Sequence, residues 1–285
     1  MKVLVTGANG YLGKGIVKQL LDDGIGVIAT DIRGDGLDSR AEIIIEDMFS
    51  LEDPYNYYGK PDVLLHLAWR NGFVHNSPTH INDLSGHYDF ICKMIDGGLS
   101  QVAIMGSMHE IGFFEGSIDE NTPCNPQSLY GISKNALRQL TELKCKSTGC
   151  TFQWLRGFYI VGNTLDGSSI FSKIAVAEKE GKTEFPFTTG LNQYDFLDYE
   201  NFCKYVAHTV EQSEINGIVN ICSGRPEKLS DRVERFIKEN NYSIKLDYGK
   251  FPDRPYDSKA LWGNNQKILA IEYNRSKKEK ECSND

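Results

Sequence analysis

The N-terminal segment places the strongest constraint on the fold. A short apolar run at 3–5 leads directly into the segment 6–13, Thr-Gly-Ala-Asn-Gly-Tyr-Leu-Gly, and the apolar residues that follow repeat at helical spacing. This order predicts a strand, a glycine turn and a helix. Gly7 permits the tight turn, Gly10 lets a pyrophosphate approach the backbone, and Gly13 lets the helix pack close to the strand. The segment is therefore a candidate dinucleotide-binding loop, with phosphates at the helix start.

An acidic residue follows at the place where an adenosine ribose is expected. A second strand is predicted at 27–30, and Asp31 ends it. A carboxylate there accepts hydrogen bonds from both ribose hydroxyls and repels a 2′-phosphate, which favours NAD. Arg33 offers a guanidinium that holds such a phosphate, although a solvated loop arginine is an equal alternative. NAD is the predicted cofactor, and NADP stays open.

Two further apolar runs, at 41–46 and 63–68, predict the next strands of a parallel sheet. Asp47 follows the first of these runs and is a candidate to contact the adenine of the cofactor, although a loop cap is the plainer explanation for this aspartate. The second run ends at Ala68, which is expected to border the cofactor. A helix predicted over 81–95 and a strand over 102–105 continue the alternation. Strands that alternate with helices indicate an α/β fold, a doubly wound parallel sheet of the Rossmann type.

A second motif begins at Ser128. This serine can cap a helix, and the apolar pattern predicts that the helix runs from Tyr130 to about Thr148. Tyr130 and Lys134 then lie on one face. A phenol titrates near pH ~10 in model peptides, and a neighbouring ammonium together with the positive helix end is expected to lower that pKa. Such a tyrosine can exchange a proton with a hydroxyl or carbonyl oxygen.

Composition excludes several classes of function. The chain has 285 residues, 40% of them hydrophobic, enough for one large or two joined domains. The net charge of −8 argues against nucleic acid or an anionic membrane as partner. Without a long apolar run or a signal-peptide pattern, and with seven scattered cysteines, a cytoplasmic location is expected. His75, His80 and His87 lack metal-ligand spacing, so no metal is predicted, although His80 can face substrate.

Taken together, the motifs resemble those of the extended short-chain dehydrogenase/reductase family, in particular its nucleotide-sugar epimerase, dehydratase and reductase branch. The residues that carry this resemblance are Thr6-Gly7-x-x-Gly10-x-x-Gly13, Asp31, His66-Leu67-Ala68, Asn82, Ser107 five residues before Gly112, and Tyr130-x-x-x-Lys134. The resemblance implies that Tyr130 is the acid/base, that Lys134 binds the nicotinamide ribose, and that Ser107 contacts the reacting oxygen. It also implies a homodimer whose interface includes the Tyr130 helix.

The predicted contacts fall into two sets. The cofactor-binding residues are Gly7, Asn9, Gly10, Tyr11, Leu12, Gly13, Asp31, Arg33, Asp47, Met48, Leu67, Ala68, Tyr130 and Lys134. The substrate-binding residues are Trp69, Ser107, Met108, His109 and Arg254. The resemblance assigns Arg254 to the phosphates of the substrate, and a surface arginine paired with a neighbouring aspartate is the alternative.

Two departures from the family pattern bear on the reaction. Met108 and His109 stand where dehydratases of the family carry an Asp-Glu pair, which disfavours elimination. Trp69 replaces a small residue and either narrows the sugar pocket or packs in the core. Bulk around the sugar hinders the turning that an epimerase requires. The predicted function is therefore NAD(P)-dependent reduction of a nucleotide-linked 4-keto-6-deoxyhexose at C4, with a 4-epimerase or a non-catalytic dinucleotide sensor as alternatives.

The resemblance also predicts the domain organisation. Residues 1–160, with a return through 195–222, are expected to form the dinucleotide-binding domain. Residues 161–194 and 223–275 are expected to form a smaller α/β substrate-binding lobe. The charged segment 276–285 is expected to be a disordered tail, because it lacks apolar periodicity.

Overall fold

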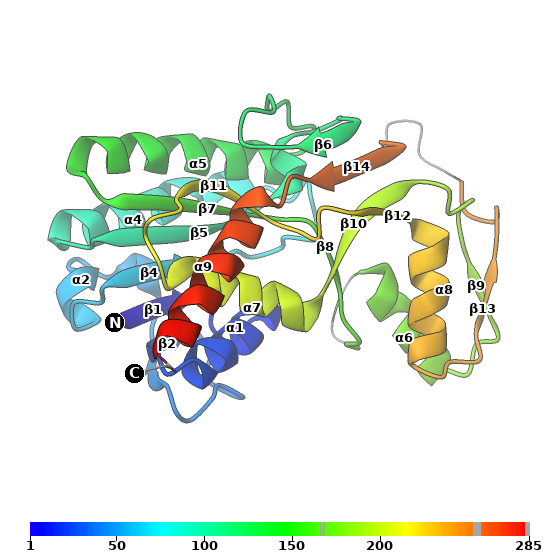
Figure 1. Ribbon diagram of the computed structural model, residues 1–285, viewed down its shortest axis with the longest axis horizontal. Coiled ribbons are helices and arrows are strands. Elements are labelled where there is room, and N and C mark those ends of the chain that lie inside the picture. The colour runs from blue at the N-terminus through cyan, green and yellow to red at the C-terminus, as the bar shows by residue number, and fades with distance from the viewer. Residues whose placement is uncertain (166, 168, 253–257, 283–285) are drawn as a thin grey trace.

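A sheet of seven parallel strands forms the centre of the larger lobe (Figure 1). The computed structural model describes residues 1–165, 167, 169–252 and 258–282. The strands of this sheet, in chain order, are β1 (Lys2–Thr6), β2 (Gly26–Asp31), β3 (Glu42–Ile45), β4 (Val63–His66), β5 (Gln101–Ser107), β7 (Thr151–Gly157) and β11 (Gly217–Ile221). Their spatial order is β11-β7-β5-β4-β1-β2-β3, so the winding direction reverses between β1 and β4. The predicted doubly wound fold is confirmed, and its switch point lies between these two strands.

Helices cover both faces of this sheet because alternate strand residues point to opposite sides. Val3 and Val5 of β1 belong to one apolar core, whereas Leu4 belongs to the other. The first core is covered by α1 (Tyr11–Asp22), α7 (Tyr199–Val210) and α9 (Gln266–Cys282). The second is covered by α2 (Pro54–Tyr57), α4 (Leu84–Gly97) and α5 (Leu129–Thr148). Figure 1 shows the two layers of helices on either side of the strands.

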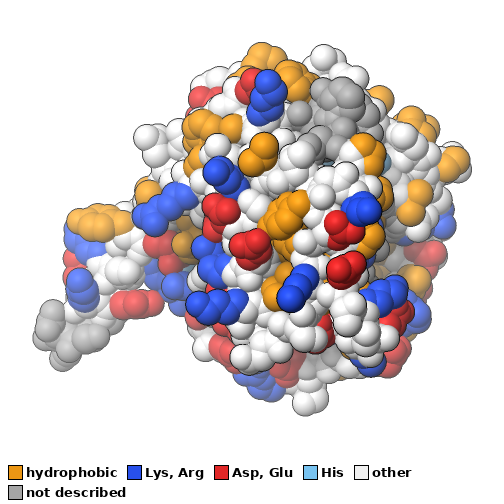
Figure 2. Space-filling view, turned by 90° about the vertical axis from the view of Figure 1, so that its right-hand side faces the viewer, with side chains coloured by type: hydrophobic (Ala, Val, Ile, Leu, Met, Phe, Trp, Pro, Cys, Tyr) orange, Lys and Arg blue, Asp and Glu red, His pale blue; other side chains and the backbone are white. Residues whose placement is uncertain are grey.

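The smaller lobe has its own sheet and its own apolar core. Its strands are β6 (Gly116–Ile118), β8 (Tyr159–Val161), β10 (Gln193–Asp198), β12 (Pro226–Lys228) and β14 (Ala260–Gly263), and a separate pair joins β9 (Glu184–Pro186) to β13 (Lys245–Asp247). Helices α6 (Ile170–Lys179) and α8 (Leu229–Glu239) pack on them. On the face of this lobe that Figure 2 shows, hydrophobic side chains reach the surface between charged ones.

A buried carboxylate ties the smaller lobe to the end of β11. Asp195 of β10 is fully buried and accepts hydrogen bonds from the backbone amides of Ser223, Gly224 and Gly263 at 2.7, 2.9 and 3.1 Å. Burial raises the pKa of Asp195, and these hydrogen bonds act in the opposite direction. Three segments that are far apart in the sequence therefore meet at one side chain.

The structure departs from the predicted division of the chain in two places. Strands β6 and β10 belong to the second sheet, whereas the prediction puts their residues in the dinucleotide-binding domain. Residues 266–275, predicted as part of the substrate lobe, form the start of α9, which packs on α7 and β11 of the larger lobe. Contacts between distant segments decide both cases, and local sequence carries no signal for them.

The predicted disordered tail is also corrected. Helix α9 continues through the charged segment to Cys282, and residues 283–285 lie outside the described part of the chain. Two features hold this helix: Ile268 and Ile271 are buried in the first core, and Arg275 pairs with Asp23 and Glu211. A buried stripe this narrow gives little periodicity in the sequence, which explains the wrong prediction.

Two other local features complete the fold. The helix predicted over 81–95 is divided in two: α3 (Thr79–Asn82) and α4 meet at Asp83. Short 3-10 turns, η1 (Met48–Ser50) and η2 (Met108–Glu110), follow β3 and β5. Within the described ranges no helix is long and apolar enough to cross a membrane.

The docking of α9 can be tested with two aliphatic residues of the same helix. Ile271 is 3% exposed, whereas Leu269 is 55% exposed. We expect Ile271→Ala to lower the free energy of unfolding by about 2–5 kcal/mol, because it leaves a cavity in the first core. Leu269→Ala is the matched control and should change it by about 0.5 kcal/mol or less. Denaturant unfolding measures both; equal effects would show that α9 does not dock in solution.

Candidate active site

The glycine loop lies at the switch point and is held there by close backbone contacts. Gly7 has φ +69°, and a Cβ on it would lie 2.7 Å from the Ala68 nitrogen at the end of β4. A Cβ on Gly13 would lie 2.3 Å from the Gly7 carbonyl oxygen. Both contacts exclude any side chain, so the loop needs glycine at these positions. Helix α1 begins after Gly10 without a side-chain cap, which leaves its first amides available to phosphates.

Asp31 lies beside this loop at the carboxyl end of β2. Its Oδ2 accepts a hydrogen bond from the Asn9 amide at 3.0 Å, and its Oδ1 accepts one from Ile32 at 2.8 Å. The Asn9 side-chain oxygen is buried and has no hydrogen-bond partner in the described structure. The site fits an adenosine diphosphate moiety. The glycine loop has no side chain in the way of the phosphates, and the Asn9 oxygen beside the Asp31 carboxylate is free to accept a hydrogen bond. Arg33 is exposed.

The other predicted cofactor contacts have mixed surroundings. Asp47 caps η1, because its Oδ1 accepts a hydrogen bond from the Phe49 amide at 3.0 Å. This is the loop cap that the sequence offered as the plainer explanation for Asp47. Met48 and Leu12 pack against the two apolar cores. The ring of Tyr11 packs on Tyr199 with centroids 4.5 Å apart. Contacts of Asp47, Met48, Leu12 and Tyr11 with the cofactor stay predictions.

The three predicted catalytic residues come together at the carboxyl edge of the sheet. Ser107 ends β5, and Tyr130 lies in the first turn of α5, where Ser128 caps the helix by accepting from the Gly131 amide at 3.2 Å. The predicted helix and its cap are confirmed. Burial raises the pKa of Tyr130 to about 12, a hydrogen bond with Ser107 opposes this shift, and the charge of Glu110 adds to it. The expected lowering of this pKa is wrong for this structure, because burial of the phenol outweighs the helix end.

Lys134 lies one turn further along α5 and is almost completely buried. Its ammonium donates a hydrogen bond to the Met105 carbonyl oxygen at 2.9 Å and lies 3.9 Å from the centre of the Trp69 ring. Burial lowers the pKa of Lys134 to about 7, and the charge of Glu110 opposes this shift. The ammonium is therefore directed at β5 and Trp69, and it contributes no shift to Tyr130.

Trp69 packs against the second apolar core, and its ring also lies beside Tyr130 with centroids 6.3 Å apart. Its Nε1–H donates to His80 Nδ1 at 3.0 Å. An indole nitrogen can only donate, so His80 carries its proton on Nε2, which donates to the Val74 carbonyl oxygen at 3.0 Å. The His80 ring in turn lies 5.3 Å from that of Tyr130. Packing on the core is therefore observed for Trp69, and narrowing of the sugar pocket stays a prediction.

Five of the six histidines gather around Trp69 and Tyr130. His75 stacks on the Tyr130 ring at 5.6 Å, and its carbonyl oxygen accepts from the Tyr130 amide at 2.8 Å. His109 lies 4.4 Å from His75, and burial lowers the pKa of His109 to about 4. This cluster was not predicted from the sequence, because its members come from separate elements and loops. Among the described residues, no group of histidine, cysteine and carboxylate side chains has the geometry to hold a metal ion.

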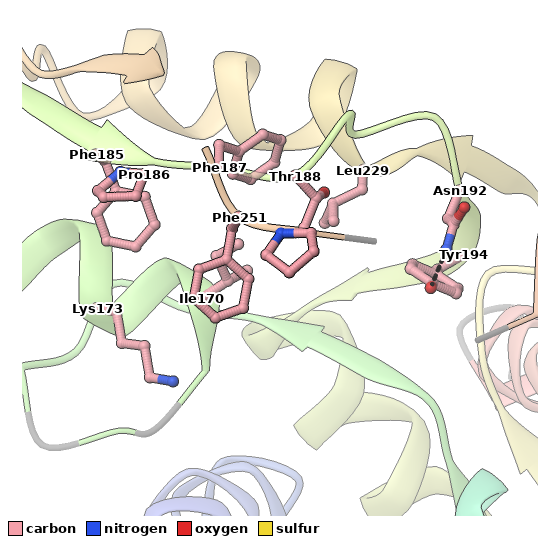
Figure 3. Close-up of a pocket in the computed structure, with 11 residues that line it drawn as sticks. Ile170, Lys173, Phe185, Pro186, Phe187, Thr188, Asn192, Tyr194, Leu229 and Phe251 are labelled. Carbon is pink, nitrogen blue, oxygen red and sulfur yellow. Dashed lines mark hydrogen bonds between the residues drawn. The ribbon is translucent and has the colours of Figure 1, made fainter. Parts of the chain in front are cut away.

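A cavity of about 280 Å³ lies in the smaller lobe (Figure 3). The residues that line it are Ile170, Lys173, Phe185, Pro186, Phe187, Thr188, Asn192, Tyr194, Leu229, Phe251 and Pro252. Figure 3 shows apolar rings along one part and the hydrogen-bonded pair of Asn192 and Tyr194, 3.0 Å apart, at one end. Its aromatic residues were not predicted from the sequence. Arg254, the predicted phosphate ligand, lies outside the described residues.

A glycine cradle at the switch point of a doubly wound sheet, with Ser107, Tyr130 and Lys134 at the same edge, is typical of an NAD-dependent oxidoreductase. The comparisons assign the chain more narrowly: residues 3–222 match the model of the NAD dependent epimerase/dehydratase family, and the chain belongs to that family. Its similarity to a curated relative, dTDP-6-deoxy-L-talose 4-dehydrogenase (NAD(+)) of Aggregatibacter actinomycetemcomitans, is 42% identity over 92% of this chain and 99% of the relative. The predicted family, enzyme class and cofactor NAD are confirmed.

Solved structures agree on the fold. The UDP-N-acetylglucosamine 4-epimerase of Methanobrevibacter ruminantium M1, in complex with UDP-N-acetylmuramic acid, matches 95% of this chain and 91% of its own with a TM-score of 0.82 at 20% identity. The UDP-glucose 4-epimerase of Thermus thermophilus, in complex with NAD, covers 96% and 93% with a TM-score of 0.78 at 18% identity. At these identities the likeness shows the fold alone.

The position of Asp31 generates a test of cofactor preference. We expect wild-type protein to bind NAD more tightly than NADP, and Asp31→Ala to weaken NAD binding by about 10-fold or more, because hydrogen bonds to a charged group contribute about 1.5–3 kcal/mol. Asp35→Ala, an exposed aspartate of the same loop, is the control and should change neither affinity. Titration of both cofactors measures this. Tighter binding of NADP by wild type would show that Arg33 dominates.

Proposed function

We propose that this protein interconverts a hydroxyl and a ketone at C4 of a dTDP-linked 6-deoxyhexose, and that reduction of the 4-keto sugar is its working direction. The observation that carries the proposal is the 42% identity, over nearly the whole of both chains, to a dTDP-6-deoxy-L-talose 4-dehydrogenase. Oxidation at C4 and reduction of the 4-keto sugar are the two directions of one reaction. The predicted substrate class and the chemistry at C4 agree with that relative.

The side chains account for the proton in this reaction. The bound cofactor would supply the hydride to the sugar carbon as NADH, or accept it from that carbon as NAD. Ser107 Oγ accepts a hydrogen bond from the His109 amide at 3.3 Å and is hydrogen-bonded to Tyr130, so a C4 oxygen that binds between the two side chains would take the place of their mutual contact. Because the pKa of Tyr130 is raised to about 12, its phenol is protonated at neutral pH and is ready to give a proton to that oxygen. The same tyrosine would take that proton back in the direction of oxidation.

The surroundings of Tyr130 support hydride transfer to one face of the sugar only. An epimerase must turn its keto intermediate so that hydride returns to the other face. Trp69, His75 and His109 all lie close to the Tyr130 ring, with centroids 6.3, 5.6 and 6.0 Å from it. Three bulky rings at this distance restrict the space in which a hexose can turn, which supports a dehydrogenase or reductase over an epimerase.

The cavity in the smaller lobe suits the nucleotide. Phe185 and Phe251 offer ring faces on which a base can stack, and Asn192 offers a polar group for its edge. Lys173 lines the same cavity and supplies a positive charge for the diphosphate. The proposal assigns the thymidine diphosphate to this cavity, with Arg254 as the further phosphate ligand that the family resemblance suggests.

The family resemblance further suggests a homodimer. Helix α5 would supply part of its interface, since Leu143 is 66% and Ile132 is 44% exposed on this helix. Exposed aliphatic side chains on a helix that packs beside α4 suit a helix-to-helix contact between two copies. The homodimer is part of the proposal.

The role of Tyr130 is tested by removing its hydroxyl. Tyr130→Phe keeps the ring but loses the proton, so we expect turnover to fall by about 10²-fold or more while NAD affinity changes little. Tyr273→Phe, on a tyrosine that is 71% exposed on α9, is the control and should be fully active. Steady-state kinetics and cofactor titration measure the two effects. Near-normal turnover of Tyr130→Phe would remove this residue from the acid/base role.

Stoichiometry tests the reaction itself. Purified protein is mixed with a dTDP-linked 4-keto-6-deoxyhexose and NADH, and both sugar product and NADH absorbance are followed. We expect one NADH consumed for each sugar reduced. Interconversion of a nucleotide hexose with its C4 epimer, without net consumption of NADH, would replace the proposal by a 4-epimerase. Cofactor binding without either reaction would indicate a dinucleotide sensor.

A further inference from the structure

The buried carboxylate of Glu110 lies next to the candidate active site and takes no part in the proposed reaction. Glu110 ends the short turn η2, which follows Ser107, and its side chain is 0% exposed. Fully burying a carboxylate is costly unless hydrogen bonds and opposite charges compensate for the lost water. The position is not in the hydrophobic core but between β5, β7 and α5, so its partners reveal what it holds.

One oxygen of Glu110 holds the backbone of Ser107. Glu110 Oε1 accepts a hydrogen bond from the Ser107 amide at 2.7 Å and another from Trp154 Nε1 at 2.7 Å. In return Ser107 Oγ accepts from the His109 amide, so the turn is closed by a capping box. Gly106 makes room for this arrangement, because a Cβ there would lie 2.1 Å from Trp154 Nε1. The direction of the Ser107 hydroxyl thus depends on the Glu110 carboxylate.

The other oxygen of Glu110 is held by charge. Glu110 Oε2 lies 3.5 Å from Arg156 Nη2 on β7 and 3.7 Å from Arg138 Nε on α5. Arg156 is itself 0% exposed. The first turn of α5 also packs directly on η2, since a Cβ on Gly131 would lie 2.4 Å from the His109 carbonyl oxygen. Glu110 therefore joins the strand that ends at Ser107 to the helix that carries Tyr130 and Lys134.

We propose that Glu110 is a positioning residue for the reaction, which fixes the Ser107 hydroxyl against Tyr130 and sets the electrostatic field in which Tyr130 and Lys134 exchange protons. This inference rests on the proposed roles of Ser107 and Tyr130. Glu110 touches neither substrate nor cofactor in this assignment and acts through Ser107 and through its charge.

The charge has a defined sign of effect. The negative charge of Glu110 raises the pKa of both Tyr130 and Lys134. Removing that charge therefore lowers both pKa values. Besides burial, Glu110 shifts the pKa of both residues, and a hydrogen bond with Ser107 shifts that of Tyr130. The charge of Lys134 in turn lowers the pKa of His66 and His87, which burial already holds low. The rings that face Tyr130 are those of His75, His80 and His109. Glu110 is thus the one acidic group that shifts the pKa of either residue in the described structure.

The experiment is a double-mutant cycle with a pH profile. Glu110→Gln keeps the size of the side chain and removes its charge; Glu142→Gln is the matched control, because Glu142 also pairs with Arg138, at 3.4 Å, but makes no contact with Ser107. We expect Glu110→Gln to lower kcat by about 10-fold or more with little change in KM for NAD, and to displace the pH profile of kcat to lower pH. Glu142→Gln should retain both the kcat and the profile of wild type.

Combination with Ser107→Ala separates positioning from general support of the fold. If Glu110 acts through Ser107, Glu110→Gln costs much less in the Ser107→Ala background than in wild type. Equal costs in both backgrounds, with no displacement of the pH profile, would overturn the inference. Full activity of Ser107→Ala would instead overturn the proposed role of Ser107, which is a distinguishable result.

A second variant covers the case in which Glu110→Gln does not fold. Glu110→Asp keeps the charge but shortens the side chain, so it should lose reach to the Ser107 amide while it still faces both arginines. We expect the wild-type pH profile with a lowered kcat. A profile displaced to the same extent as in a charge-neutral variant, or wild-type kcat together with the wild-type profile, would contradict the inference.

Discussion

The contact between Gly7 and Ala68 is the constraint on which the candidate site depends. A loop that leaves β1 and a loop that leaves β4 meet there so closely that no Cβ fits between them. This approach brings the cofactor loop next to Trp69, the residue after Ala68. The ammonium of Lys134, on helix α5, lies 3.9 Å from the centre of the Trp69 ring. The absence of a side chain at Gly7 thus allows the glycine loop, Trp69 and helix α5 to meet at one edge of the sheet.

Burial, more than any single charge, governs the protonation states at that edge. Tyr130 and Lys134 lie in a region with little water, so burial shifts the pKa of Tyr130 up and that of Lys134 down, each towards the neutral form. The pair is thereby kept as phenol and as an ammonium close to deprotonation. Glu110 is the buried charge whose field reaches both, and it is held by two arginines. At such a site, a small change in the surroundings is enough to change the protonation state of a residue.

The proposed function places the two ends of a large substrate on different lobes. The acid/base residues lie on the larger lobe, whereas the aromatic cavity lies between α6, α8 and the short β9–β13 pair of the smaller one. Asp195 links the lobes because its carboxylate accepts hydrogen bonds from the Ser223 amide, after β11, and from the Gly263 amide of β14. A nucleotide-linked sugar is long enough to need both regions, because its sugar carbon and its base are separated by a diphosphate.

The sequence by itself determined the alternation of strands and helices, the glycine loop, Asp31 and the helix that Ser128 caps, because each depends on residues close together in the chain. It also indicated the family and the residues Ser107, Tyr130 and Lys134. Only the tertiary structure decided that Lys134 points to Met105 and Trp69, that Glu110 is buried beneath Ser107, and that the charged end of the chain forms α9. These features depend on contacts between segments that are far apart in the chain. The periodicity and spacing of residues in the sequence do not reveal such contacts.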